Sequence, residues 1–344
     1  MWTLIEKYIR VENMRSVLLK DFIPVDIQDM RPVGFHTEKL FSVQNCCKKV
    51  EQGSGWQSVL SCPVCASKQR TLLMQKCNIE IVQCHQCKLG YAAKIPKEIH
   101  DVYADQKYLN QAQRDYGQNI SYRMERFAKE RVEILRKWSG RAPEECSLLD
   151  IGCGTGWFLD FCRQQGYTIA GQEFGKELAA HTEKRLETKI WSCPVSEIEK
   201  NAFFDIITLF DVLEHTADPL SMLSEVKSLL QPGGISLIFV PNLHSLGASI
   251  LQEESALVAP AEHLLYFTRE SLEYLVEKVG FELLHIETRG MDIPDLIAYY
   301  RDRRQQPEVT AFLLEYADIF QAVIDKAGRA NHMRIILRNP QAVS

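Results

Sequence analysis

Short apolar runs alternate with segments whose apolar residues recur every three or four positions through the second half of the chain. The apolar runs predict seven strands, in the sequences SLLDIG, TIAGQE, KIWSC, FDIITLFD, ISLIFVPN, ELLHIETRG and MRIILRNP. The intervening segments predict helices after Gly156, after Gly175, in PLSMLSEVKSLL and in TRESLEYLVEKV, where Thr268 is the expected N-cap. This alternation is typical of an α/β fold, with a mostly parallel sheet between two helical layers.

In such a sheet, ligands bind where the loops leave the carboxyl ends of the strands. We therefore expect one crevice, formed by the loops after Ile151, Gln172, Phe210 and Val240. Between the last two strands, at about residues 291–332, the segments DLIAYYRDRR and EVTAFLLEYADIFQAVIDKAG have helical patterns. This helical insertion is interpreted as a lid, a dimer surface or additional packing, and the sequence does not choose among the three.

A basic amphipathic helix is predicted in SYRMERFAKERVEILRKW, upstream of the first strand. Its positive side chains are interpreted as a solvated face, with contact to the phosphates of a nucleotide-linked substrate or of RNA as the alternative. The patterns divide the chain into residues 1–60 of unknown role, a cysteine-rich segment at 61–100, a helical linker at 101–143 and the α/β domain at 144–344.

Composition narrows the classes of function. A chain of 344 residues with 46% hydrophobic content can bury a sizeable core, and its net charge of -5 carries no polyanion-binding signature. Nucleic acid is therefore a minority hypothesis for the partner. No apolar run approaches the roughly 18 residues of a membrane span, and the first residues lack the apolar core of a signal peptide. We expect a cytoplasmic protein without a membrane partner, whose eleven cysteines are reduced.

Four of the cysteines have the spacing of a metal site. Cys62 and Cys65 form one C-x-x-C pair and Cys84 and Cys87 form another, with 18 residues between the pairs. Four thiolates on two tight turns predict a closed, structural Zn²⁺ site, and the strand pattern of IEIVQC between them predicts a β-hairpin zinc ribbon. Redox or merely buried cysteine pairs are the alternative. Cys77 and His85 are substitute ligand candidates that lack a paired neighbour.

The glycine-rich loop in LLDIGCGTGWFLDF separates an apolar run from a helical pattern. A dinucleotide fingerprint has the spacing G-x-G-x-x-G, but the position that its third glycine would take is Trp157. The spacing here is G-x-G-x-G, after Asp150, and no Walker-type Lys-Ser/Thr pair follows it. The loop therefore predicts close approach of the backbone to a ligand that need not carry phosphate.

LLDIGCGTG resembles the first motif of class I S-adenosylmethionine-dependent methyltransferases, and the likeness extends over most of residues 147–339. The Pro-Gly-Gly turn in QPGGISLIFVPN and the segment LFDVLEHTADP also resemble that family. The resemblance implies a Rossmann-like, seven-stranded sheet whose last strand is antiparallel. It also implies that S-adenosyl-L-methionine binds at Asp150, Gly152, Gly154, Gly156, Glu173, Phe174, Phe210 and Asp211, with Glu173 on the ribose hydroxyls.

Candidate acid/base residues lie in VAPAEHLLYFTRESL, where Glu262 and His263 precede the helix capped by Thr268. The zinc-ribbon sugar C-methyltransferases, which act on nucleotide-linked keto-deoxysugars, carry a similar Glu-His pair. Methyltransferases of other substrates have a similar His-x-x-x-Phe-Thr pattern, in which the histidine braces the loop, so both roles stay open. His215 is interpreted as structural or cofactor-orienting. Tyr103 and Tyr108 are candidates for the acceptor pocket or for an exposed linker.

Three functions remain on the sequence alone. The leading prediction is a methyltransferase with a structural zinc ribbon that acts on a small molecule, such as a sugar, a polysaccharide precursor or a secondary metabolite. An RNA methyltransferase with a zinc-binding recognition module is the first alternative, since some rRNA methyltransferases have an amino-terminal zinc module. A non-catalytic protein that binds S-adenosyl-L-methionine is the second alternative. The oligomeric state is left open.

Overall fold

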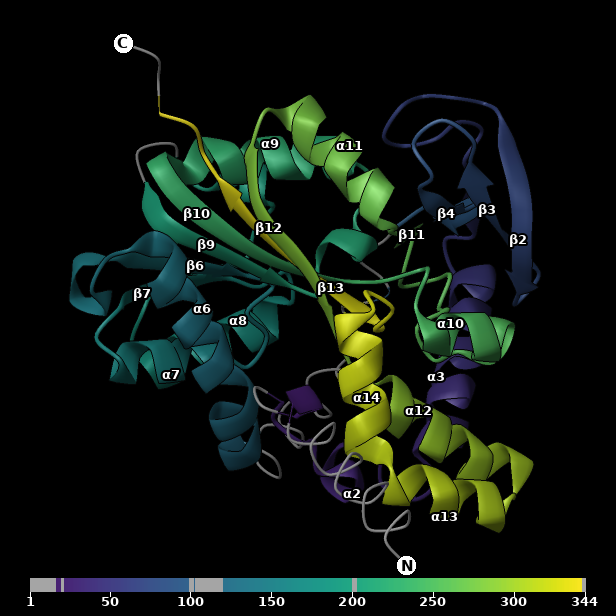
Figure 1. The fold of residues 1–344 in the computed structure, drawn as a ribbon. Coiled ribbons are helices and arrows are strands. Elements are labelled where there is room, and N and C mark those ends of the chain that lie inside the picture. Colours follow the sequence, from purple (N-terminus) through teal and green to yellow (C-terminus); the bar gives the residue numbers. More distant parts are fainter. Residues whose placement is uncertain (1–16, 20–21, 99–101, 103–119, 200–202, 342–344) are drawn as a thin grey trace, which may run out of the picture.

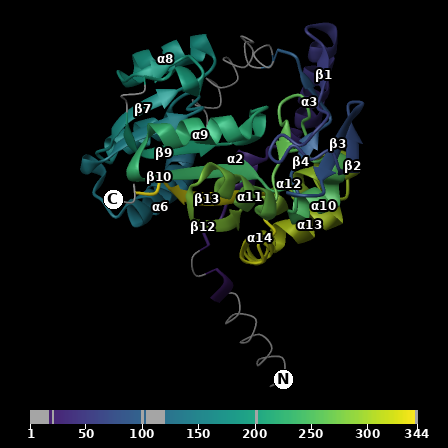
Figure 2. The same cartoon turned by 90° about the horizontal axis from the view of Figure 1, so that it is seen from above.

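The computed structural model describes residues 17–19, 22–98, 102, 120–199 and 203–341 (Figure 1). Tyr103 and Tyr108 lie outside these residues. Figure 2 shows the α/β domain beside a smaller, mostly β module, with the helical insertion next to that module. Within the described residues, no helix combines the length and the apolar character that are needed to cross a bilayer.

A seven-stranded sheet forms the centre of the α/β domain, in the order β12-β13-β10-β9-β6-β7-β8. The strands are β6 (Ser147–Ile151), β7 (Thr168–Gln172), β8 (Ile190–Trp191), β9 (Phe204–Phe210), β10 (Leu230–Pro241), β12 (Glu282–Arg289) and β13 (His332–Arg338). Only β13 runs antiparallel to its neighbours in this sheet. All seven predicted strands are confirmed, and β10 starts earlier than predicted because Leu230 already pairs with Phe204.

Helices cover both faces of this sheet, which explains why its central strands β6, β9 and β10 are mostly apolar rather than alternating. Leu148 packs with α6 (Lys129–Ser139), α7 (Trp157–Gln164) and α8 (Lys176–Leu186) on one face. Leu149, the next residue of β6, packs with α9 (Pro219–Leu229) and α11 (Arg269–Val279) on the other face. Figure 1 shows these two groups of helices on opposite sides of the strands.

Helix α11 begins where the sequence predicts. The Oγ1 of Thr268 accepts a hydrogen bond from the backbone N–H of Ser271 at 3.1 Å, and the Oγ of Ser271 accepts one from the N–H of Thr268 at 2.8 Å. This reciprocal capping box satisfies two N–H groups that a helix end leaves without partners. The helix ends before Gly280, whose left-handed φ of 76° suits a glycine C-cap.

The cysteine-rich module is a sheet in the order β11-β4-β3-β2 together with a second strand pair. Its strands are β2 (Arg70–Lys76), β3 (Ile79–Cys84) and β4 (Gly90–Ala92), and β1 (Trp56–Ser58) pairs with β5 (Lys94–Pro96). The predicted hairpin corresponds to β2 and β3. Strand β11 (Leu265–Tyr266) comes from the α/β domain and pairs with β4, so the two parts of the chain share a sheet.

The remaining helices and turns are distributed over the amino-terminal segment, the linker, the loops of the α/β domain and the insertion. They are α2 (Ile27–Met30), α3 (Phe35–Gln52), the π-helical turns η1 (Met124–Ala128) and η6 (Tyr300–Arg304), α10 (Leu246–Leu251), α12 (Asp292–Tyr299), α13 (Pro307–Glu315), α14 (Ala317–Lys326) and the 3₁₀ turns η2 (Pro143–Glu145), η3 (Val195–Glu197), η4 (Leu213–His215) and η5 (Gln252–Glu254). The helical insertion is thus helical as predicted, whereas α3 was not predicted. Helix α3 packs against α12 and η6.

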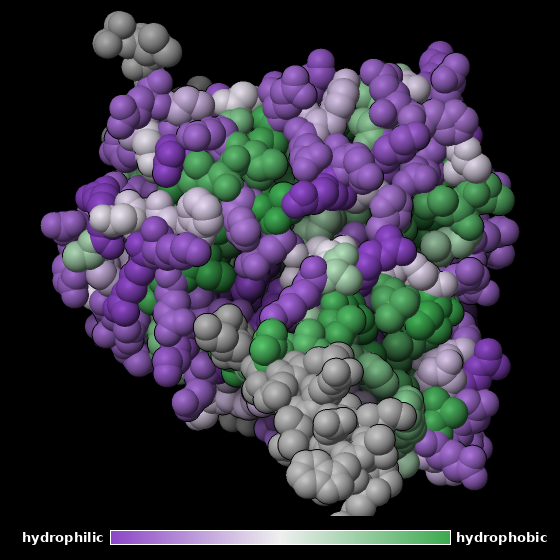
Figure 3. All heavy atoms as spheres, in the orientation of Figure 1, coloured by the Kyte–Doolittle hydropathy of each residue, from purple (hydrophilic) through white to green (hydrophobic). Residues whose placement is uncertain are grey.

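The surface shown in Figure 3 is mostly hydrophilic, with smaller apolar patches between the polar side chains. The helical insertion contributes several exposed, large apolar or aromatic side chains: Val309, Phe312, Leu314, Tyr316 and Val323. Phe312 and Tyr316 also contact each other, with ring centroids 5.2 Å apart.

Candidate functional site

A cleft of about 530 Å³ lies at the carboxyl ends of β6, β7 and β9. The α/β domain lines it with the predicted loops after Ile151, Gln172 and Phe210. The module side of the cleft is lined by Gln57, Ile95, Pro96, Lys97 and Glu98, which no sequence pattern marked. The cleft therefore lies between the two parts of the chain.

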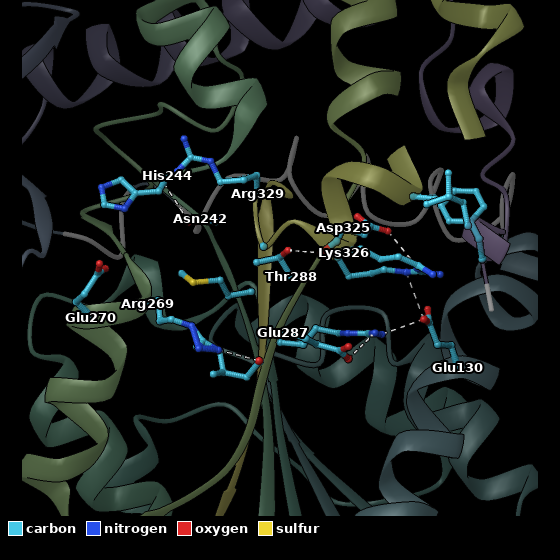
Figure 4. Close-up of a pocket in the computed structure, with 18 residues that line it drawn as sticks. Glu130, Asn242, His244, Arg269, Glu270, Glu287, Thr288, Asp325, Lys326 and Arg329 are labelled. Carbon is cyan, nitrogen blue, oxygen red and sulfur yellow. Dashed lines mark hydrogen bonds and ion pairs between the residues drawn. The ribbon is translucent and has the colours of Figure 1, made fainter. Parts of the chain in front are cut away.

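The loop after Val240 departs from the prediction of a single crevice. It begins in a second cavity, of about 670 Å³, which Asn242 and His244 help to line (Figure 4). The loop comes back to the border of the cleft only near His263, which contacts His215. Three of the four predicted loops therefore line the cleft directly, within the residues that the structure describes.

The glycine loop has the backbone that its sequence implies. Gly152, Gly154 and Gly156 have φ values of 69°, 54° and 69°, in the left-handed region that glycine tolerates best. A Cβ atom on Gly152 would lie 2.5 Å from Cγ2 of Val212, so that position has no room for a side chain. The Oγ1 of Thr182 donates to the carbonyl oxygen of Gly154 at 2.9 Å, which fixes the loop.

Glu173 joins the glycine loop to the end of β7. Its carboxylate is almost fully buried and accepts hydrogen bonds from the N–H of Gly154 at 3.0 Å and of Gly175 at 2.8 Å. Burial raises its pKa, and these two bonds oppose the increase. A carboxylate offers about four lone-pair positions, so these bonds leave capacity for hydroxyl groups of a ligand. Glu173 and Phe174 both line the cleft.

Asp150 lies beneath the glycine loop and does not contribute to the described lining of the cleft. It is 4% exposed, and its carboxylate accepts a hydrogen bond from the Oγ1 of Thr208 at 2.6 Å. Burial raises its pKa to about 7, against the opposing effects of Thr208 and Arg131. Its hydrogen bond in this structure therefore joins β6 to β9 just before the glycine loop begins.

Phe210 and Asp211 follow β9 and differ in their surroundings. The ring of Phe210 packs edge-on between Phe158 and Phe239, with centroids 5.0 and 4.9 Å away. Asp211 lines the cleft with a left-handed φ of 57°, and its carboxylate pairs with Nε2 of His332 at 3.2 Å. The ion pair outweighs the desolvation of the carboxylate and lowers the pKa of Asp211 to about 2.

The basic helix is only partly solvated. Lys129, Arg136 and Lys137 are exposed, as interpreted from the sequence. That interpretation is wrong for Arg126, which is 6% exposed and pairs with Glu130 at 2.9 Å. Arg131 turns toward the domain, with its guanidinium carbon 3.8 Å from the ring centroid of Phe210, an arrangement that gives a cation–π attraction.

The sequence-predicted pair Glu262 and His263 is divided between two environments. The Glu262 carboxylate contacts the thiol of Cys46 on α3, and burial together with this contact raises the pKa of Cys46 to about 12. His263 contacts the carbonyl oxygen of Leu257 through Nδ1 at 2.8 Å. Burial and neighbouring His215 lower its pKa to about 3, so the ring is neutral near pH 7. Neither Glu262 nor His263 contributes to the described lining of the cleft.

His215 is the imidazole that lines the cleft. Its Nδ1 lies 2.9 Å from the carbonyl oxygen of Glu262, and its ring stands edge-on to His263 with centroids 4.8 Å apart. Burial lowers its pKa, whereas the carbonyls of Glu262 and Asp211 oppose that decrease. The DVLEH motif made His215 a candidate residue, but the motif alone does not predict which way its ring points.

The four predicted metal ligands converge. The Sγ atoms of Cys62 and Cys87 are 3.4 Å apart, those of Cys65 and Cys84 are 3.3 Å apart, and all four lie within 4.8 Å of one another. Such a cluster of four thiols is the donor set of a structural Zn²⁺ site. Cys77 and His85 are not in this cluster, and Nε2 of His85 instead contacts the hydroxyl of Thr71.

Two matching turns produce this convergence. In the first, the N–H of Cys62 donates to the carbonyl of Ser67, and the N–H of Ala66 donates back to the carbonyl of Cys62. The second turn repeats both bonds, from Cys84 to Leu89 and from Lys88 to Cys84. Ala66 and Lys88 take the same left-handed conformation, with φ values of 58° and 62°. The repeated turns orient one cysteine pair toward the other.

The second cavity borders β12, α14 and the start of α11, and its charged walls were not predicted (Figure 4). Arg289 pairs with Asp325 at 3.0 Å and with Glu130 at 3.5 Å, and Arg334 pairs with Glu287 at 2.6 Å. Pairing of these charges connects α6, β12, β13 and α14, so the network has a structural role in its own right.

Known proteins that are similar in sequence to part of this chain include methyltransferases. Ubiquinone biosynthesis O-methyltransferase of Vibrio parahaemolyticus is 35% identical over 109 residues, 29% of this chain and 45% of that protein. The Escherichia coli protein of the same name is 33% identical over 125 residues, 34% of this chain and 50% of that protein. The chain thus spans half or less of the length of these curated relatives.

A structural relative and a family complete the comparison. Magnesium protoporphyrin IX methyltransferase from Synechocystis has a TM-score of 0.49 and 13% identity, over 71% of this chain and 98% of that chain. Residues 108–286, slightly more than half of the chain, match the family described as methyltransferase domain. These residues include the glycine loop, Glu173 and His215 of the cleft. The chain therefore belongs to the methyltransferase domain family.

Proposed function

We propose that the protein is a methyltransferase that uses S-adenosyl-L-methionine and acts on a small molecule. The observation that carries the proposal is the junction of Glu173 with the glycine loop, since an almost buried carboxylate and three left-handed glycines meet at the carboxyl ends of β6 and β7. Membership of the methyltransferase domain family supports the same activity.

The cofactor in this proposal lies along the predicted residues. The Glu173 carboxylate would accept hydrogen bonds from the ribose hydroxyls, and Phe174 would lie beside the adenine. Gly152 and Gly154 would let the methionine part approach the backbone. The negative charge of Asp211 attracts the ammonium group of the methionine part. Asp150, Gly156 and Phe210 hold the loop and strand ends in place. When bound, the cofactor supplies a methyl group on a sulfonium, which is open to displacement by an electron-rich acceptor.

The acceptor, in this proposal, reacts near His215 and His263. His215 lines the cleft and His263 stands directly behind it, whereas the Glu262 carboxylate turns toward Cys46. The acceptor must lose a proton to become electron-rich, and a neutral imidazole of this pair would accept that proton. Methyl transfer forms a bond from the acceptor to the methyl carbon and breaks the carbon–sulfur bond, whose electron pair stays on sulfur.

A small acceptor is favoured over RNA. A volume of about 530 Å³ is within the range of small-molecule sites. The basic helix gives little support to RNA binding because Arg126 is buried and Arg131 turns inward. The relatives are named for O-methylation in ubiquinone biosynthesis, so a hydroxyl-bearing acceptor joins sugars, polysaccharide precursors and secondary metabolites as a candidate.

A structural Zn²⁺ on Cys62, Cys65, Cys84 and Cys87 belongs to the same proposal. The convergence of the four thiols on two matching turns supports it. The module that the ion would stabilise contributes Ile95 and Lys97 to the cleft, so the metal acts on the cofactor site through the fold. It takes no part in the chemistry, because four protein ligands leave no open position.

The test is to incubate the purified protein with methyl-labelled S-adenosyl-L-methionine and a cell extract, then to separate small molecules, RNA and protein. Label is expected among the small molecules. Glu173→Gln should weaken cofactor binding in calorimetry at least tenfold, whereas Glu177→Gln, an exposed control four residues along, should bind normally. Label in RNA would contradict the substrate class, and cofactor binding without any labelled product would favour the non-catalytic alternative.

A further inference from the structure

His332, the first residue of β13, contacts the Asp211 side chain that lines the cleft. Nε2 of the imidazole lies 3.2 Å from Oδ1 of the carboxylate, and the two side chains are 19% and 50% exposed. The cleft therefore reaches Asp211, whereas the ring that contacts it is mostly enclosed by protein. Asp211 also has a left-handed backbone, a conformation that a residue other than glycine keeps only where its surroundings fix it.

The amide of Asn331 determines where the His332 ring carries a proton. Nδ1 of His332 lies 2.9 Å from Oδ1 of Asn331. This same Oδ1 accepts a hydrogen bond from the backbone N–H of Met291 at 3.0 Å, and Nδ2 of Asn331 donates to Oδ2 of Asp295 at 2.8 Å. Because a backbone N–H only donates, the amide orientation is fixed, and the contact with Asp295 agrees with it. Nδ1 of His332 therefore donates to Asn331.

Both ring nitrogens of His332 thus face acceptors. With a proton on each nitrogen, the ring makes two hydrogen bonds and places a positive charge opposite the negative charge of Asp211. Burial lowers the pKa of His332, but the ion pair with Asp211 outweighs burial and raises the pKa above its usual 6.5. The ring therefore favours the cationic form, which donates to Asp211 through Nε2.

The amide that orients this ring is anchored from a distant part of the chain. Asp295, on α12, accepts hydrogen bonds from Asn331 and from Nε of Arg31 in the amino-terminal segment. Asn331 is 2% exposed, and its backbone N–H donates to Oδ2 of Asp292 at 2.7 Å. The amide cannot turn without breaking these contacts, so His332 keeps the Nδ1 proton when the ring loses its charge.

We propose that His332 is a positioning residue that holds the Asp211 carboxylate at the cleft for a cationic group of the cofactor. The inference rests on the proposed function, in which Asp211 attracts the ammonium group of the methionine part. The imidazolium donates to one oxygen of Asp211 and so fixes how the carboxylate faces the cleft. When Nε2 loses its proton, its lone pair faces the carboxylate and repels it. Cofactor affinity should therefore decrease as the pH rises through the pKa of His332.

Several ionisable groups face this pair from the surrounding elements. They are Asp292 and Asp295 on α12, Glu214 and His215 on η4, His263 before β11, Arg289 on β12 and Arg131 on α6. Burial raises the pKa of Asp292 to about 6 and lowers that of Arg131 to about 10, so both lie outside the range from pH 7 to pH 9. Burial lowers the pKa values of His215 and His263 away from this range, and it raises that of Glu214, whose carboxyl stays neutral near pH 7.

NMR of the full-length protein with labelled histidine tests the state of the ring without any cofactor. The His332 signal is assigned by its absence from His332→Gln. Its titration midpoint should lie above 6.5 and should fall in Asp211→Asn, which lacks the negative charge. A midpoint at or below 6.5, or an unchanged midpoint in Asp211→Asn, would overturn the inference whatever the activity of the protein.

Calorimetry with S-adenosyl-L-homocysteine, the demethylated product that keeps the ammonium group, tests the positioning role. His332→Leu should weaken binding tenfold or more at pH 7, whereas the amide of His332→Gln can donate to Asp211 and should recover most of the loss. His181→Leu, at an exposed position on α8, is the matched control and should bind normally. The affinity of wild type relative to His332→Gln should fall between pH 7 and pH 9. Titration of the ammonium group of the ligand cancels in this ratio.

A merely structural role of His332 gives a different result. Both variants would then lose affinity by factors that do not change with pH, and this outcome would overturn the positioning role. If His332→Leu does not fold, the pH dependence of wild type relative to His332→Gln still decides. Wild type that binds no ligand would contradict the proposed function, whereas wild type and His332→Leu that bind equally well would contradict only the role of His332.

Discussion

At the scale of single residues, the glycine loop depends on backbone conformations that side chains resist. Gly152 and Gly154 have similar positive φ values, but their surroundings differ. A Cβ on Gly152 would meet Val212 at 2.5 Å, and a Cβ on Gly154 would meet nothing within 4 Å. The two positions therefore separate the cost of the conformation from the cost of the contact.

We predict that Gly154→Ala lowers the free energy of unfolding by about 1 kcal/mol, the cost of a left-handed alanine. Gly152→Ala should cost distinctly more, since Val212 must also move. Urea unfolding of the two variants beside wild type measures both costs. Equal losses would show that the loop relaxes away from Val212.

Asp150 should make stability depend on pH. Its pKa in the folded protein is about 7 instead of 3.8, so its contribution to stability is full below pH 3.8 and is lost as the pH rises through 7. Asp150→Asn stays neutral throughout. Relative to wild type, its free energy of unfolding should increase by up to about 4 kcal/mol between pH 4 and pH 8, at roughly 1.4 kcal/mol per pKa unit.

The control for Asp150 is Thr208→Val, which removes the hydrogen bond that favours the ionised carboxylate. The pKa of Asp150 should rise further in this variant, so its loss of stability should continue to a higher pH than in wild type. Parallel profiles for wild type and Asp150→Asn from pH 4 to pH 8, measured by urea unfolding, would show that Asp150 does not titrate in this range.

Single residues also show where sequence reasoning stops. Glu173 could be placed from its distance to the glycine loop, because both follow adjacent strands. The direction of the His215 ring could not be predicted in this way. It depends on the left-handed conformation of Asp211 and on the carbonyl of Glu262, which is 47 residues away. Arg126 and Arg131 were assigned to solvent because their partners, which include the carbonyl of Pro24 and the ring of Phe210, are distant in sequence.

At the scale of elements, the periodic patterns were sufficient for the α/β domain. Its central strands are buried on both faces and its helices on one, so each type of burial gives a different spacing of apolar residues in the sequence. Helix α3 escaped prediction because only His36, Val43, Cys47 and Val50 of its 18 residues are buried. Strand β11 escaped because its two residues gain their partners from β4, far away in the chain.

The capping box of α11 gives a prediction at this scale. Thr268→Ala should lower the free energy of unfolding by about 1 kcal/mol, because the N–H of Ser271 loses its acceptor in a fully buried position. Thr268→Ser keeps the hydroxyl and should recover most of that loss. Thermal unfolding of the three proteins measures it, and equal losses in both variants would assign the effect to the methyl group of threonine.

At the scale of the whole molecule, segments that are far apart in the sequence contact one another, so the predicted segments are interleaved in space. The amino-terminal segment contacts the helical insertion, where Arg31 pairs with Asp295 at 2.5 Å and the N–H of His36 donates to Asp302. The cysteine module takes β11 from the α/β domain and lines the cleft opposite the glycine loop. Contacts this distant in sequence leave no periodic pattern, so they could not be predicted.

This interleaving predicts that damage to the cysteine cluster reaches the cofactor site. Cys84→Ser should lower bound zinc well below one ion per chain at that cluster and should weaken binding of S-adenosyl-L-methionine, since the wall with Ile95 and Lys97 loses its support. Zinc content and calorimetry measure the two effects. Cys77→Ser lies outside the cluster and should leave zinc unchanged; cofactor affinity that is normal in Cys84→Ser would show that the module folds independently of the cleft.

The shared strand also sets an order of events during synthesis. The four cysteines and β4 leave the ribosome about 170 residues before β11 does, and at about 5–20 residues per second this interval lasts roughly 10–30 s. A metal-loaded module can form in that time, but the edge of β4 that β11 later occupies stays open. In the nascent chain this edge is a site for unwanted strand pairing, so chaperone protection during translation should matter more for this protein than for one whose modules close one after the other.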